Sequence, residues 1–382
     1  MSEILAYIGT YHPNGEGVYL YSMNKETGAL TRKSVVSTKE SPAQLVIDSV
    51  NNKLYTASEI TNYQGGNNGS VISYSIDVAS GSLTFIQECD ALGGLPCHLS
   101  LDNENKHLMV ANYACGSVAV FPIGSDGAVS KSSSFFKTAG DVGPLRAEGS
   151  QPGSFSISGH DGVHAHWIGT DRSGRYAFHT DLGQDRIYQW KYSNGNLAPN
   201  SPAWIPAASK GCGPRHLVFH PSKDYAYIIN EESSTVTHYD FDSNTGLLKE
   251  RSTISNFEAG YKGSSFGSGI VVSPCGKRIY ALNRLRNTIT HFDISEQDGS
   301  LSFIEEVWTR GDFPRALTID PTHRFLYVLN QRSDNITYFT IDQQSGKLQF
   351  NNNYIDVGSP SQLNHEHINY FLILERVYKS FP

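Results

Sequence analysis

The sequence predicts an all-β fold, a seven-bladed β-propeller, and the main observation behind it is an internal repeat. Six segments share one pattern: a strand, a turn, a second strand that ends in a small polar residue, and a third strand. Asn230, Asn283 and Asn330 hold the same place in three copies, at separations of 53 and then 47 residues. A period near 50 residues built of short strands is typical of propeller blades, which pack only against their neighbours.

The copies can be followed in order along the chain. Two looser copies come first, then one intermediate and three clear copies, beginning at Pro42, Pro96, Val163, Gly213, Ser268 and Phe313. Residues 6–30 match the second half of the same unit but lack its innermost strand, and residues 357–370 resemble the opening of the copy near Pro42. We therefore expect a C-terminal strand to complete the first blade and close the ring. The path of the tail after Leu363 stays open.

One insertion interrupts the repeat. Asn112 and Asp181 are equivalent positions 69 residues apart, which is roughly twenty residues more than one repeat, and the excess is the Gly/Ser/Pro-rich segment at about 138–162. Loops of this length often border functional sites, although a tolerated surface insertion is the alternative. The whole chain, 1–382, is thus predicted as one propeller domain carrying one long loop.

Composition excludes several classes of protein. The formal net charge is −7 with no basic stripe, so a nucleic-acid partner is not expected. No apolar stretch approaches about 18 residues and no secretory signal opens the chain, so we expect no membrane partner and a cytoplasmic protein. The five cysteines are scattered and lack CxxC spacing, so they are predicted to be reduced and mostly buried thiols.

Charged side chains are predicted to meet at one end of the central channel. In a propeller the first strands line the channel and the second strands end around one mouth. His164 and His166 lie in a first strand, Arg215 begins the next one, Glu231 follows a second strand, and Arg284 ends the second strand of the following copy. Buried charges are unfavourable unless they are paired, hydrated or used. These five residues from three successive blades are therefore candidates for a site.

The sequence around these residues resembles the seven-bladed lactonase family, which includes propeller-type 6-phosphogluconolactonases and fungal carboxymuconate lactonising enzymes. The matching stretches include HAH at 164–166, GPRHLVFHP at 213–221, YIINE at 227–231 and IYALNR at 279–284. The resemblance spans nearly the whole chain. It implies that His164, Arg215, Glu231 and Arg284 form the active-site cluster and that neither a metal nor another cofactor is needed. One departure is Gly269, where relatives usually carry an acid.

The residue types themselves suit the opening of a lactone. This reaction needs a water molecule directed at the carbonyl carbon and a stabilised oxyanion. Arg215 and Arg284 suit the oxyanion or a carboxylate or phosphate of the substrate. His164 is expected to act as a base toward water, and Glu231 either protonates the leaving oxygen or orients the base, two roles that could be exchanged.

Each assignment has an alternative. Arg215 and Glu231 could form only an ion pair between blades, and His166 could be a ligand contact or a hydrogen-bonded channel histidine. Arg315 repeats the Pro-Arg pair found at Arg215 and either contacts the substrate or serves the blade. A zinc or calcium site at the HxH pair lacks a third ligand at suitable spacing. The asparagines that recur at the ends of second strands are predicted to cap turns.

We therefore expect a metal-independent lactone hydrolase of carbohydrate metabolism, with a small-molecule lactone as its partner. The simplest substrate is 6-phosphogluconolactone, an intermediate of the pentose phosphate pathway. The alternatives are a cycloisomerase that forms a lactone from a carboxymuconate, and a non-catalytic propeller that binds partners on its rim. The oligomeric state and the identity of the lactone stay open.

Overall fold

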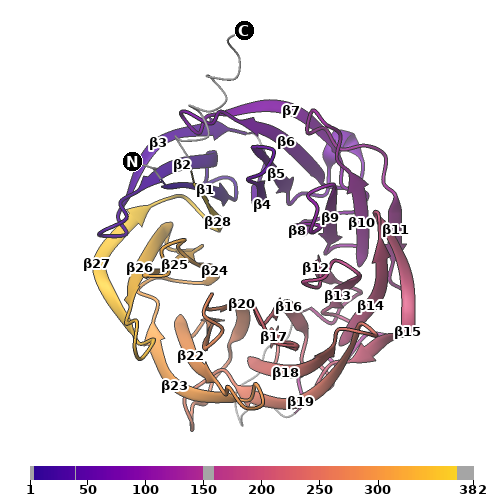
Figure 1. Ribbon diagram of the computed structural model, residues 1–382, viewed down its shortest axis with the longest axis vertical. Coiled ribbons are helices and arrows are strands. Elements are labelled where there is room, and N and C mark those ends of the chain that lie inside the picture. Colours follow the sequence, from indigo (N-terminus) through magenta and orange to yellow (C-terminus); the bar gives the residue numbers. More distant parts are fainter. Residues whose placement is uncertain (1–3, 39, 149–158, 368–382) are drawn as a thin grey trace.

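The computed structural model describes residues 4–38, 40–148 and 159–367, and its strands form seven four-stranded antiparallel sheets. The sheets are arranged as blades around a central opening, with one strand of each nearest the centre (Figure 1). The predicted seven-bladed propeller is therefore confirmed. Among the described residues the only helical element is one short 3-10 turn, Tyr63–Gly65, and no helix is long or apolar enough to cross a membrane.

The strands fall into four concentric sets. The inner strands are β4 (Pro42–Asp48), β8 (Pro96–Leu101), β12 (Ala165–Thr170), β16 (Pro214–Phe219), β20 (Phe266–Val272), β24 (Pro314–Ile319) and β28 (Pro360–His367). The second strands are β1 (Ile4–Thr10), β5 (Lys53–Ser58), β9 (His107–Asn112), β13 (Tyr176–Asp181), β17 (Tyr225–Asn230), β21 (Arg278–Arg284) and β25 (Phe325–Asn330). The third strands are β2 (Gly17–Met23), β6 (Ser70–Ile76), β10 (Ser117–Pro122), β14 (Arg186–Ser193), β18 (Thr235–Asp242), β22 (Thr288–Ile294) and β26 (Asn335–Ile341). The outer strands are β3 (Leu30–Ser37), β7 (Leu83–Asp90), β11 (Ser134–Lys137), β15 (Asn196–Pro206), β19 (Leu247–Ser255), β23 (Leu301–Trp308) and β27 (Leu348–Asp356).

The C-terminal strand closes the ring, as the sequence predicts. β28 pairs with β1 in antiparallel register from His367 opposite Ile4 to Pro360 opposite Thr10. Leu363 of β28 is buried in a core cluster with residues of β1 and of the neighbouring blade. The pairing covers the inner edge of β1, which would otherwise expose its backbone groups. The tail beyond residue 367 lies outside the described residues.

The cores lie between neighbouring blades. The second strands are almost entirely buried because both of their faces pack against other sheets, whereas the outer strands are largely exposed. Repeated tyrosines of the second strands add a specific contact to this packing. Four of them, Tyr7, Tyr227, Tyr280 and Tyr327, donate a hydrogen bond to the carbonyl of a positive-φ glycine in an adjacent blade, as in Tyr7–Gly81 (2.6 Å), Tyr227–Gly299 (2.8 Å) and Tyr280–Gly346 (2.7 Å). The glycine turns of the repeat thus fix one blade against the next.

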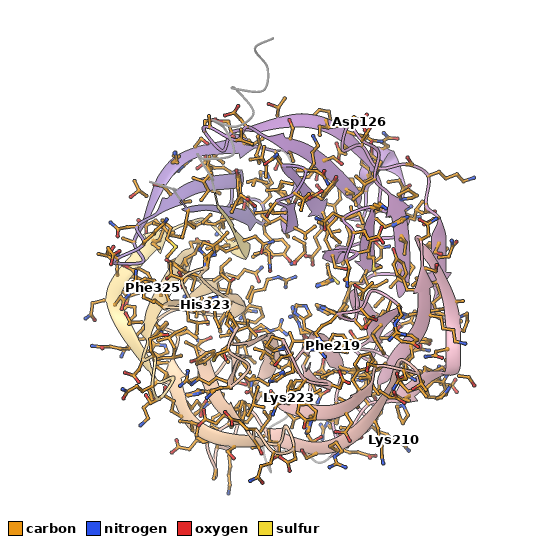
Figure 2. The ribbon with its side chains drawn as sticks, in the orientation of Figure 1. Asp126, Lys210, Phe219, Lys223, His323 and Phe325 are labelled. Atoms are coloured by element: carbon orange, nitrogen blue, oxygen red, sulfur yellow. The ribbon has the colours of Figure 1, made fainter. Side chains whose placement is uncertain are left out.

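A β-bulge near the start of every inner strand shapes the channel. At this place one extra residue of the inner strand interrupts the register with the second strand. We call these seven residues the bulge ring: Ala43, Cys97, His166, Arg215, Ser268, Arg315 and Ser361. The residues that end the second strands or directly follow them form a mouth ring: Tyr11, Glu59, Tyr113, Leu182, Glu231, Arg284 and Gln331. Side chains of the inner blade region extend into the central opening (Figure 2).

The predicted insertion connects β11 to β12, and its residues 149–158 lie outside the described residues. The described parts of the insertion form hydrogen bonds with the following blade, which consists of β12 to β15. Gly143 N donates to Gly183 O at 2.8 Å, and His160 Nε2 lies 3.1 Å from Asp185 Oδ1. The same carboxylate accepts hydrogen bonds from backbone N–H groups of residues 211 and 213, just before β16. The insertion is therefore tied to the segment that leads into Arg215.

Candidate active site

A carboxylate held between two arginines forms the centre of the candidate site. Arg215 Nε lies 2.8 Å from Glu231 Oε2, and Arg284 Nη2 lies 2.5 Å from the same oxygen. Arg215 is 2% exposed, Glu231 8% and Arg284 6%. We refer to these three residues as the triad. Because two cations share one anion, the triad carries a net positive charge.

The triad corrects one sequence-based alternative. Arg215 in β16 and Glu231 after β17 belong to the same blade, so their ion pair does not join two blades. The contact between blades is made by Arg284, which ends β21 of the next sheet. The structure therefore brings together three of the four residues predicted to be catalytic, and it does so across one blade boundary.

The backbone of β20 holds both guanidinium groups in place. Arg215 Nη1 donates to Ser268 O at 2.7 Å, and Arg284 Nη2 donates to Gly267 O at 3.2 Å. A Cβ on Gly267 would lie 2.7 Å from the carbonyl oxygen of Asn230, so this close approach requires glycine. The fixed fork of donors in arginine makes such positioning specific.

The triad retains capacity to bind a ligand. The Nε atoms of Arg215 and Arg284 are buried and make no hydrogen bond to any described residue. Arg215 Nε is close to Glu231 Oε2, but the N–H is not aligned for a hydrogen bond. Buried donors are normally satisfied in native structures. The unsatisfied donors and the net positive charge together favour an anionic or strongly polarised ligand at this place.

The charges of the triad are maintained near neutral pH. Burial raises the pKa of Glu231, but Arg284 and Arg215 lower it further, so the pKa of this carboxyl lies below its usual value. Burial and the neighbouring charge of Arg284 lower the pKa of Arg215 to about 10. Glu231 is therefore a carboxylate, which suits the orienting role predicted for it better than donation of a proton to a leaving group.

His164 immediately precedes β12 and belongs to neither ring. Its Nδ1 lies 2.9 Å from Tyr113 O and its Nε2 lies 2.8 Å from Asp161 Oδ1. The imidazole stacks on the ring of Tyr113 with centroids 4.1 Å apart. Both ring nitrogens thus face oxygen acceptors, and the imidazole is held between Tyr113 and Asp161.

His166 belongs to the bulge ring and contacts the mouth ring. It is 5% exposed, and its ring lies edge-on to Tyr113 at 5.7 Å and to His216 at 5.2 Å. Burial and the charges of Arg215 and other channel arginines hold the pKa of His166 well below its ordinary value. Its Nδ1 is buried without a hydrogen-bond partner among the described residues. His166 is therefore a neutral imidazole with an available nitrogen beside the triad.

Arg315 belongs to a second ionic cluster in the channel. Its Nη2 lies 3.2 Å and 3.1 Å from the two carboxylate oxygens of Glu59, and its Nε donates to Ser361 Oγ at 3.2 Å. The Tyr11 hydroxyl also donates to Glu59, and the Arg315 guanidinium lies 4.9 Å from the Tyr11 ring centroid. We call these four residues the Glu59 cluster. Arg315 thus reaches the channel, but its charge is already paired.

Sequence reasoning missed Tyr11, Glu59 and Tyr113. Their signal was present, because each occupies the same repeat position as Glu231 and Arg284, immediately after the polar end of a second strand. The copies that carry them are the looser ones, so their equivalence was not evident from the residues alone.

Gly269 lies one residue beyond the bulge ring. It lines a channel cavity of about 200 Å³ together with residues at the same position of the other blades, namely Gln44, His98, Trp167, His216, Ala316 and Gln362. A Cβ on Gly269 would lie 2.5 Å from Leu317 Cδ2. The missing acid is therefore a feature of this cavity and is accompanied by close packing from the next blade.

Other sequence predictions can be compared directly with the structure. Asn230, Asn283 and Asn330 donate hydrogen bonds to side chains of the third strand and so link it to the end of the second strand across the turn. All five cysteines are free, but only Cys97 and Cys212 are buried, so the prediction of mostly buried thiols was wrong. Within the described part of the chain, no group of three or more His, Cys, Asp or Glu side chains could hold a metal ion.

Comparison with known sequences identifies relatives over almost the whole chain. The family model described as "Lactonase, 7-bladed beta-propeller" matches residues 5–365. The chain is 31% identical over 313 residues to the 6-phosphogluconolactonase of Bacillus subtilis (strain 168). That alignment covers 81% of this chain and 83% of the Bacillus protein.

Solved structures give the same relationship. The periplasmic gluconolactonase PpgL of Pseudomonas aeruginosa superposes with a TM-score of 0.87 and 28% identity, covering 96% of this chain and 100% of that one. A candidate 6-phosphogluconolactonase from Bacteroides fragilis NCTC 9343 gives a TM-score of 0.83 and 28% identity, covering 95% of this chain and 98% of that one.

Proposed function

This chain belongs to the lactonase family of seven-bladed β-propellers, and we propose that it hydrolyses 6-phosphogluconolactone to 6-phosphogluconate at the mouth of its central channel. The observation that carries the proposal is the triad. It is buried, positively charged and furnished with unsatisfied donors, in a chain whose named relatives are lactonases. The site acts on a small molecule and uses only groups of this chain.

The two arginines supply the electrostatic part of the reaction. Water attack on the lactone carbonyl places a negative charge on the carbonyl oxygen, and donors fixed before the reaction stabilise that charge. Arg215 and Arg284 are held by Glu231 and by the backbone of β20, so they need little rearrangement to meet either this oxyanion or the substrate phosphate. Removing one such donor typically slows catalysis by about 10²–10³.

Proton transfer is assigned to the histidines. A water molecule gives one proton to a base as its oxygen bonds to the carbonyl carbon; the bond from that carbon to the ring oxygen then breaks, and the ring oxygen receives a proton. His166, whose Nδ1 has no hydrogen-bond partner among the described residues, is our candidate for the base. His164, predicted as the base from the sequence, is held between Tyr113 O and the exposed carboxylate of Asp161, and we assign it the second proton transfer.

Single replacements separate the two histidines. We expect His166→Ala to lower kcat by about 10² or more, because positioned acid–base groups contribute that much. His164→Ala should lower kcat as well, and an added imidazole buffer should rescue it more readily, since its ring lies against the exposed Asp161. Full activity of His166→Ala with loss of activity in His164→Ala would return the role of base to His164.

The proposal as a whole is tested by turnover of freshly prepared 6-phosphogluconolactone, corrected for spontaneous hydrolysis, with glucono-δ-lactone measured in parallel. We expect catalysed hydrolysis that is faster for the phosphorylated lactone. A rate equal to the spontaneous rate for both lactones would overturn the proposal. The cycloisomerase and the non-catalytic binding module are not proposed, since the relatives named above are lactonases.

The cytoplasm is the compartment we propose, because all five cysteines are free thiols. The Pseudomonas relative is named as periplasmic, so fractionation of cells that express this chain from its natural gene is the appropriate measurement.

A further inference from the structure

The Glu59 cluster is a second charged group in the same two rings as the triad. Arg315 and Ser361 are bulge-ring residues like Arg215, and Tyr11 and Glu59 are mouth-ring residues like Glu231. In agreement with this placement, the charge of Arg315 lowers the pKa of Glu231 and of Arg215. The cluster and the triad therefore belong to one electrostatic site.

Glu59 accepts the hydrogen bonds that the Arg315 guanidinium could otherwise donate to an anionic ligand. Both carboxylate oxygens contact Nη2 of the guanidinium, and the Tyr11 hydroxyl donates to the same carboxylate. The side chains of Arg315 and Glu59 are only 12% and 13% exposed, so the pair is largely withdrawn from water. Burial lowers the pKa of Arg315, but Tyr11 and Glu59 raise it further, which keeps the cation paired. A ligand carboxylate could use the same donors only if Glu59 were absent.

Glu59 also sets the net charge of the site. Three arginines face two glutamates, which leaves one positive charge, and that charge belongs to the triad. This suits a ligand with one anionic substituent. A lactone of a phosphorylated sugar acid carries its charge on the phosphate alone, whereas its hydrolysis product carries a carboxylate in addition.

We propose that Glu59 is a specificity-determining residue that blocks the Arg315 donors and so disfavours ligands with a second anionic group. The proposal rests on the proposed function for its choice of ligands. Its consequence is that the site binds the lactone in preference to the hydrolysed acid, because opening the ring creates the second anion. Glu59 thereby favours release of the product.

Binding of two sugar phosphates tests the inference without requiring turnover. Isothermal titration calorimetry would compare 6-phosphogluconate, which has a phosphate and a carboxylate, with glucose 6-phosphate, which has only the phosphate. In Glu59→Ala, which removes both acceptor oxygens, we expect the Kd of 6-phosphogluconate to fall by about tenfold or more relative to that of glucose 6-phosphate, as hydrogen bonds to charged groups warrant. An unchanged ratio of the two Kd values, or no binding of 6-phosphogluconate to the variant, would overturn the proposal.

Two further variants keep the result interpretable. In Glu59→Ala/Arg315→Gln the gain for 6-phosphogluconate should disappear, since the released guanidinium is what binds the carboxylate; persistence of the gain would contradict the proposed role. Glu306→Ala is the matched control, because Glu306 also pairs with an arginine but lies on the outer strand β23. Near-ultraviolet circular dichroism confirms that each variant is folded. Failure of lactone turnover in the wild type would count against the proposed function only, because the Kd ratio is measured independently.

Discussion

Replacing Glu231 by glutamine tests whether the triad holds the active site together. The change keeps the shape of the side chain and one oxygen acceptor but removes the only negative charge between Arg215 and Arg284. Two guanidinium groups, 2% and 6% exposed, would then face each other without a counter-ion. Breaking a buried ion pair by removing one partner destabilises proteins by about 3–5 kcal/mol. Because the amide oxygen can still accept one hydrogen bond, we expect a loss near the lower end, about 3 kcal/mol.

A double-mutant cycle isolates the ionic contribution. Arg284→Met removes the second cation while retaining an apolar side chain beside Phe266 and Phe313, whose rings lie 5.4 and 5.1 Å from the guanidinium carbon. Glu231→Gln/Arg284→Met then leaves one unpaired cation instead of two. We expect the double variant to be more stable than the sum of the single losses by about 2 kcal/mol, within the range found for residues in direct contact.

The assay is equilibrium unfolding in denaturant followed by circular dichroism, with lactone hydrolysis measured on the same samples. Glu231→Gln should also lower kcat/KM by about 10² or more, since both arginines lose their fixed position. Glu16→Gln serves as the control, because its ion pair with Arg32 is about half exposed, and we expect a change below about 0.5 kcal/mol. Strictly additive losses of stability, together with unchanged kcat/KM in Glu231→Gln, would refute the reasoning.

Two further predictions follow from buried groups of the channel and the blades. Burial holds the pKa of His98 and of His179 at about 3, and burial with Arg215 holds that of His216 well below its usual value. Below pH about 6.5, the histidine pKa of the unfolded chain, the unfolded chain therefore binds more protons than the folded protein. The contribution of these histidines to the free energy of unfolding is complete above that pH. It is lost as the pH falls, by about 1.4 kcal/mol per pH unit for each histidine. Equal unfolding free energies at about pH 7.5 and pH 5.0 would contradict this. Gly269→Asp should destabilise the protein by about 1–3 kcal/mol, because its Cβ would meet Leu317 at 2.5 Å; a thermal midpoint equal to that of the wild type would show that the cavity accommodates the acid.

The fold was largely predictable because it repeats. Each blade is encoded locally by short strands and turn residues. Where the strand pattern of one copy is weak, comparison with the other copies still assigns its strands. Recurring asparagines, such as Asn230 and Asn283, marked the ends of the second strands, and their side chains bond to the third strands across the turn. The closing strand was also predictable, since residues 357–370 resemble the start of another copy.

The candidate site was predictable only in part. Glu231 and Arg284 stand in clear copies of the repeat, and in the structure Glu231 pairs with both Arg215 and Arg284. The Glu59 cluster was not foreseen, because Arg315 and Glu59 are separated by 256 residues and meet only when the ring closes. Strand periodicity placed His164 and His166 on one side, but the bulge in β12 gives only His166 a place in the bulge ring.

The sequence by itself determined the architecture, the number of blades and the end of the channel at which charged residues gather, since each of these follows from a local pattern repeated along the chain. Only the tertiary structure decided which charges are paired. Arg315 and Arg215 have similar local sequences. Nevertheless Arg315 forms its ion pair with Glu59, whereas Arg215 shares Glu231 with Arg284. The physical reason is that pairing of buried charges depends on contacts across the ring, and no local pattern of residues encodes those distances.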